Sequence, residues 1–112
     1  MNIDIRDQSD IVKHYGIRSQ LGIAQEECAE LIQAISKVQR NKNEYADSVE
    51  FVNERRRVVE EMADVIVCLN QLQYIFLVPD QELSEIVDRK ISRQVSRMLT
   101  EKTHSKNSMP FG

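Results

Sequence analysis

Four carboxylates in two apolar segments have the types and the spacing needed to bind a metal ion. The segment QEECAELIQ contains Glu27 and Glu30, and the segment EEMADVIVCL contains Glu61 and Asp64. In each segment an acidic doublet is followed, three residues after its second member, by a third acid. Residues three apart are neighbours on the surface of an α-helix. The spacing therefore predicts two carboxylates on one face of each of two helices.

The phase of the apolar residues predicts that these carboxylates face inward. At about 100° per residue, Glu27 and Glu61 fall inside the apolar arcs of their helices. Glu30 and Asp64 fall at the edges of the same arcs. Ionised carboxylates withdrawn from water are costly unless they are compensated, and four of them would also repel one another. Oxygen ligands without His or Cys suit a hard cation, so we expect Mg²⁺ or Mn²⁺ between the helices.

Four helices are needed to position these residues. Apolar residues that recur at intervals of three and four predict the ranges 9–15, 18–39, 48–77 and 80–101. Gly16 is expected to close the first helix, and Asp47 with Glu50 resembles a capping box that opens the third. Pro79 ends the third helix, and Asp80 is expected to cap the fourth. The fold class predicted is all-α.

Composition limits the classes of function. The 112 residues predict one domain over 1–102 and a flexible polar tail over 103–112. The net charge of −3 argues against a surface that binds nucleic acid. The start MNIDIRDQSD has no basic and apolar leader, and no apolar stretch is long enough to span a membrane. We therefore expect a cytoplasmic protein without a membrane or nucleic-acid partner.

The two cysteines are expected to be reduced and buried. Cys28 and Cys68 lie inside apolar helical patterns and form no CxxC motif. The apolar arc of the second helix is predicted to centre on Cys28 and Ile35. A redox function is not expected for either thiol.

The acidic segments resemble the MazG-like, all-α nucleoside triphosphate pyrophosphohydrolase superfamily, which also contains the dimeric dUTPases. Its signature is ExxE on one helix and ExxD on the next, and it stands here as EECAEL and EEMADV. The resemblance covers roughly residues 18–97. It implies a four-helix unit that forms an obligate homodimer or homotetramer. It also implies Mg²⁺-dependent cleavage of a nucleoside triphosphate to the monophosphate and pyrophosphate, with the four carboxylates as metal ligands and catalytic residues.

Further residues are implied to bind the substrate. The family often has a lysine and an arginine on the following helix, and Lys90 and Arg93 stand at that place. Lys90, Arg93 and Arg97 also fall within one narrow strip at about 100° per residue. Asn70 is similar to asparagines that contact a sugar or base in dUTPase-like relatives. A related enzyme, phosphoribosyl-ATP pyrophosphohydrolase, commonly has a histidine where this chain has Cys68. The substrate of that enzyme is therefore not expected here.

Two alternatives remain open at the level of sequence. The carboxylates could be solvated charges paired with basic residues, as Arg57, four residues before Glu61, illustrates. The cationic strip on the last helix could likewise be a solvated face. The chain could then be a non-catalytic helical module for self-association or for binding a partner helix.

Overall fold

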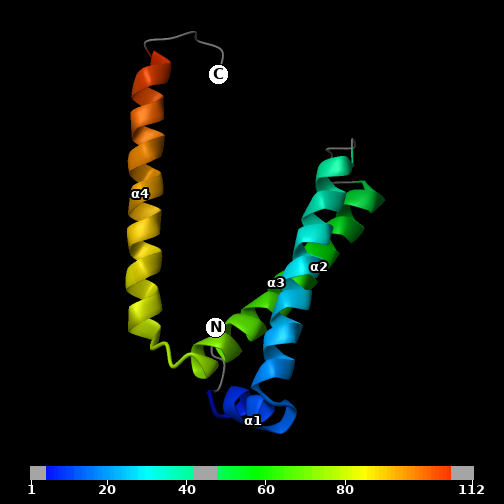
Figure 1. The fold of residues 1–112 in the computed structure, drawn as a ribbon. Coiled ribbons are helices and arrows are strands. Elements are labelled where there is room, and N and C mark those ends of the chain that lie inside the picture. The colour runs from blue at the N-terminus through cyan, green and yellow to red at the C-terminus, as the bar shows by residue number, and fades with distance from the viewer. Residues whose placement is uncertain (1–4, 42–47, 107–112) are drawn as a thin grey trace. The chain divides into compact units, whose positions relative to one another are not determined.

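Four α-helices make up the described chain. The computed structural model describes residues 5–41 and 48–106, and these ranges contain no strand. The helices are α1 (Ile5–Tyr15), α2 (Ile17–Arg40), α3 (Val49–Ile75) and α4 (Asp80–Lys106) (Figure 1). The predicted all-α class is confirmed. In the described part of the chain, none of the helices combines the length and the apolar character that a membrane span requires.

The helix ends differ from the predicted ends mainly at the outer elements. Helix α1 begins at Ile5 rather than at residue 9, and α4 ends at Lys106 rather than at residue 101. The extension of α4 is polar and that of α1 has Ile5 as its only apolar residue, so neither carries the apolar periodicity that predicts a helix. The bounds of α2 and α3 lie within two residues of the prediction, which is the usual uncertainty of helix ends.

Gly16 separates α1 from α2, as the sequence predicts. Its φ of 94° and ψ of 151° lie in a region that residues with a side chain rarely adopt. The amide of Gly16 donates to the carbonyl of Val12 at 2.8 Å and so completes the last turn of α1. The chain can therefore turn sharply between two helices without an intervening loop.

The two predicted helix caps are corrected. The side chain of Ser48 caps α3 by accepting a hydrogen bond from the amide of Phe51 at 3.1 Å. The predicted capping residue Asp47 lies outside the described residues. Asp80 is the first residue of α4, and the carbonyl that accepts the first main-chain bond of this helix belongs to Pro79. Asp80 therefore lies inside the first turn, where a negative charge interacts favourably with the helix dipole.

Two compact units divide the chain. The first, Met1–Leu77, contains α1, α2 and α3, and the second, Val78–Gly112, contains α4. In the first unit α2 and α3 run antiparallel and side by side, and α1 packs against both (Figure 1). A buried hydrogen bond from Gln20 Nε2 to Gln71 Oε1 at 2.8 Å joins α2 to α3 near α1. At the opposite end, the side-chain amide of Asn41 donates to both carboxylate oxygens of Glu54 at 3.1 Å.

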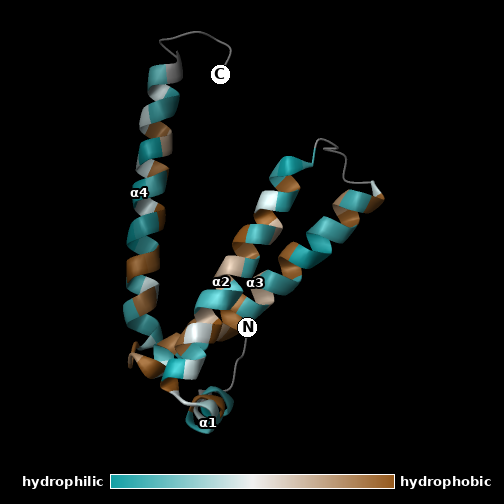
Figure 2. Cartoon of the chain, turned by 45° about the vertical axis from the view of Figure 1, so that its right-hand side comes forward, coloured by the Kyte–Doolittle hydropathy of each residue, from teal (hydrophilic) through white to brown (hydrophobic). Residues whose placement is uncertain are grey.

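The interface between α2 and α3 follows a seven-residue repeat on both helices. On α2 the buried or half-buried positions include Gln20, Ala24, Glu27, Leu31, Ala34 and Val38. On α3 they include Glu54, Val58, Glu61, Val65, Cys68 and Leu72. This alternation of three and four is the spacing by which two helices interlock along their length. Figure 2 shows the resulting alternation of hydrophobic and hydrophilic residues along both helices.

The predicted centre of the apolar arc on α2 is wrong, and the predicted burial of Cys28 is wrong as well. Cys28 is exposed and Ile35 is 44% exposed, whereas Cys68 is buried as predicted. The interface passes instead through the small residues Ala24 and Ala34, which are 7% and 2% exposed. Small side chains allow two helix backbones to approach closely. The larger apolar residues beside them are left on an open face.

Candidate metal centre

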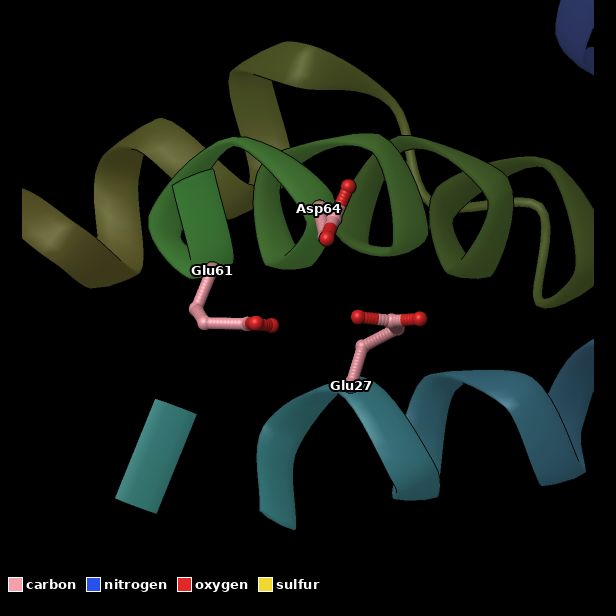
Figure 3. A group of neighbouring side chains, drawn as sticks. All are labelled: Glu27, Glu61 and Asp64. Atoms are coloured by element: carbon pink, nitrogen blue, oxygen red, sulfur yellow. The ribbon is translucent and has the colours of Figure 1, made fainter. Parts of the chain in front are cut away.

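Three of the four predicted carboxylates converge between α2 and α3. Glu27 on α2 and Glu61 and Asp64 on α3 each place one carboxylate oxygen within 4.8 Å of the others. Figure 3 shows the side chains of Glu27 and Glu61 extending into the space between the two helices, with Asp64 beside them. Glu27 and Glu61 are half-buried and Asp64 is exposed. Glu27 and Glu61 therefore lie on the inner side of their helices as expected, although the predicted centre of the apolar arc on α2 does not.

The fourth carboxylate lies at the edge of this group. Glu30 is exposed, and its negative charge raises the pKa of Glu61. We call Glu27, Glu30, Glu61 and Asp64 the carboxylate cluster. The first members of the two doublets, Glu26 and Glu60, are exposed and take no part in it.

The repeat of the interface explains why glutamates occur there. Glu27 lies between Ala24 and Leu31 in the repeat, and Glu61 lies between Val58 and Val65. Both positions would ordinarily carry apolar residues. The antiparallel pairing then brings the two glutamates to the same level of the interface. A carboxylate at such a position lowers the stability of the fold unless it is compensated.

The pKa of Glu27 is raised above its usual value of 4.5. Partial burial is the largest cause, because it disfavours the charged form. The negative charges of Asp64, Glu30 and Glu61 follow, and a hydrogen bond with Asp64 adds to the effect. Glu27 therefore holds a proton at a higher pH than an exposed glutamate does.

The pKa of Glu61 is raised for the same kinds of reason. Partial burial comes first, followed by the charge of Glu30, the hydrogen bond with Glu30, and the charge of Asp64. The positive charge of Arg57 opposes these effects and lowers the pKa of Glu61. Arg57 thus offsets only part of the repulsion within the cluster.

Two carboxylate oxygens of the cluster have no compensating partner. In the part of the chain that the structure describes, Glu27 Oε2 and Glu61 Oε2 are buried and form no hydrogen bond. A buried acceptor without a donor is costly. A hard divalent cation satisfies such oxygens from both helices at once, and three or four carboxylates are a suitable donor set for Mg²⁺ or Mn²⁺. The residues present fit such an ion.

The thiol of Cys68 lies near this centre but is kept in its neutral form. Burial raises the pKa of Cys68 most, and the charges of Glu27, Cys28 and Asp64 raise it further. A protonated thiol is a poor nucleophile and a poor metal ligand. The chemistry of the centre therefore depends on the carboxylates.

The predicted substrate-binding residues are not part of this cluster. Lys90, Arg93 and Arg97 lie on α4 in the second unit and are exposed. The side-chain amide of Asn70 donates to the carbonyl of Ile66 at 2.9 Å. It is therefore engaged within its own helix.

Sequence reasoning missed two polar features of the α2–α3 interface. One is the buried pair of Gln20 and Gln71, and the other is a groove beside Lys37 and Arg57. A signal for the groove was available, since Lys37 follows Glu30 by seven residues and Arg57 precedes Asp64 by seven. Comparisons of the chain with protein-family models, with curated proteins and with solved structures found no match.

Proposed function

We propose that this protein is a Mg²⁺-dependent nucleoside triphosphate pyrophosphohydrolase of the MazG-like type. One observation carries the proposal: carboxylates from two antiparallel helices converge within 4.8 Å, and two of their oxygens are buried without a partner. The ExxE and ExxD spacing that these residues form is the spacing of that superfamily. The product pair is a nucleoside monophosphate and pyrophosphate.

The proposal assigns a role to each carboxylate of the cluster. Glu27, Glu61 and Asp64 hold the cation, with Glu30 at its edge. Bound Mg²⁺ would polarise the α-phosphate and lower the pKa of a water molecule. One of the glutamates accepts the proton of that water as a general base. Lys90, Arg93, Arg97 and Asn70 are proposed as further substrate contacts.

The test is a panel of canonical, deoxy and damaged nucleoside triphosphates with Mg²⁺ or Mn²⁺, read by the identity of the products. We expect pyrophosphate and a monophosphate from at least one substrate. Replacing residues that orient metal ligands costs about 10- to 100-fold in metal affinity or activity, so replacing a ligand itself, as in Glu61→Gln, should lower activity by at least about 100-fold. Glu60→Gln is the matched control, because Glu60 is the exposed member of the same doublet. Circular dichroism should show that both variants remain folded.

The second candidate function is a non-catalytic module for helical self-association. It is favoured by an open apolar face on the first unit, which includes Ile32, Ile35, Met62 and Leu69, between 44% and 64% exposed. Exposed apolar patches of this kind are typical of protein contacts. The hydrolase proposal also includes a homodimer or homotetramer, so self-association alone does not separate the two candidates. They differ in whether the protein hydrolyses a nucleotide. A panel that yields no product with either metal, from a chain that self-associates, would favour the module.

A further inference from the structure

A polar groove lies between α2 and α3 beyond the carboxylate cluster. Its cavity volume is about 380 Å³. Its lining residues are Ala34, Lys37, Glu50, Asn53, Glu54 and Arg57. All of these described lining residues belong to the first unit.

The groove is on the same side of the helix pair as the cluster. Lys37 lies seven residues after Glu30 on α2, and Arg57 lies seven residues before Asp64 on α3. Seven residues make nearly two full helical turns, so each pair shares a face and is separated by about 10 Å along the axis. Arg57 is also one turn from Glu61, and its charge acts on that carboxyl group. The groove therefore adjoins the carboxylate cluster along the α2–α3 interface.

Two of the described residues that line the groove are cations, Lys37 and Arg57. The carboxylate of Glu54 is held by the side-chain amide of Asn41. Lysine supplies a mobile point charge, and arginine supplies a planar fork that matches two phosphate oxygens. Asn53 adds a further amide to the lining.

We propose that Lys37 and Arg57 bind the β- and γ-phosphates of the substrate, which leave as pyrophosphate. The proposal rests on the proposed function, because it takes the cluster as the place of the α-phosphate. The triphosphate then extends along the α2–α3 interface from the cluster toward Arg57. The nucleoside extends in the opposite direction, toward α1.

The reaction that this arrangement serves is a single displacement at the α-phosphorus. A bond forms between the oxygen of water and the α-phosphorus, and the bond from that phosphorus to the bridging oxygen of the β-phosphate breaks. The electron pair of the broken bond stays on the bridging oxygen, and a carboxylate of the cluster takes the proton of the water. Lys37 and Arg57 stabilise the negative charge that develops on the departing pyrophosphate.

The acids in the groove make binding dependent on the metal. Lys37 and Arg57 are balanced by Glu50 and Glu54, so the four charged lining residues have no net charge. Free pyrophosphate gains little from such a lining. Pyrophosphate complexed with Mg²⁺ is anchored by the cluster as well, and it should bind much more tightly.

The test is calorimetric titration of the full chain with pyrophosphate, with and without Mg²⁺. Hydrogen bonds to charged groups correspond to roughly a 10- to 100-fold change in affinity. Lys37→Gln and Arg57→Gln should each weaken binding of Mg²⁺-pyrophosphate by about that factor, while binding of Mn²⁺ alone is retained. Arg55→Gln is the matched control, because Arg55 lies two residues from Arg57 and does not line the groove. It should bind Mg²⁺-pyrophosphate as the wild type does.

The outcomes separate this proposal from the proposed function. The groove proposal is overturned if the wild type fails to bind Mg²⁺-pyrophosphate, or if Lys37→Gln and Arg57→Gln bind it unchanged. It is also overturned if only Lys90→Gln and Arg93→Gln lose binding. If binding depends on Lys37 and Arg57 but no nucleotide is hydrolysed, the phosphate site stands and the hydrolase proposal fails.

Discussion

Glu27 and Glu61 are carboxylates at positions where the helix interface would otherwise be apolar. Their phase could be predicted from sequence, because three-residue spacing and the apolar arc place both on the inner side of their helices. The groove at Lys37 and Arg57 could not be predicted in the same way. It depends on which residue of α2 lies opposite which residue of α3. A single sequence does not specify that register, whereas the hydrogen bond between Gln20 and Gln71 shows it directly.

The raised pKa values of Glu27 and Glu61 predict how stability changes with pH. The folded chain holds these protons more tightly than the unfolded chain, whose glutamates titrate near 4.5. Their contribution to the free energy of unfolding should therefore fall as pH rises from about 4.5 through the raised pKa, and level off above it. In metal-free buffer, Glu27→Gln should become increasingly more stable than the wild type over that range. Urea denaturation at several pH values measures the difference.

Added Mg²⁺ provides the control for this titration. It should stabilise the wild type at neutral pH, where the cluster is most strongly charged, and should have less effect on Glu27→Gln. A difference between variant and wild type that shrinks as pH rises would contradict the account.

At the scale of elements, apolar periodicity predicted the existence and the type of all four helices. It did not predict the polar ends of α1 and α4, which carry no such pattern. It also placed the centre of α2 at Cys28, because periodicity weights large apolar residues. The observed interface passes through the small buried residues Ala24 and Ala34.

The turn between α1 and α2 can be tested by comparing alanine substitutions at Gly16 and Gly22. Gly16 has a φ of 94°, so Gly16→Ala should strain the backbone and cost about 1–3 kcal/mol. Gly22 lies inside α2, and a Cβ added there meets nothing within 4 Å. Gly22→Ala should therefore stabilise the protein by roughly 0.5–1 kcal/mol. Chemical denaturation of both variants measures the two effects, and equal effects would contradict the observed turn.

At the scale of the whole molecule, a single chain leaves much apolar surface exposed. On the first unit this surface extends over α2 and α3, and on α4 it includes Leu83, Val87 and Ile91. The homo-oligomer that the family resemblance implies would cover such surface, and it stays a prediction.

Self-association can be tested by a charge placed on the open face of α2. Ile32 is 64% exposed in the single chain, so Ile32→Glu should leave the fold intact. If this face lies in a contact between copies, the buried charge should weaken the assembly severely. Val49→Glu is the control, because Val49 is 76% exposed at the start of α3. Sedimentation velocity over a range of concentrations measures the mass, and an Ile32→Glu chain that assembles like the wild type would refute this role of the face.

The central claim is that the carboxylates between α2 and α3 hold a divalent cation. Titration of the protein with Mn²⁺, followed by the electron paramagnetic resonance signal of the free ion, tests it most directly. The account predicts uptake of Mn²⁺ by the wild type and by Glu60→Gln, and loss of that uptake in Glu61→Gln. No uptake by the wild type, or equal uptake by Glu61→Gln, would contradict it.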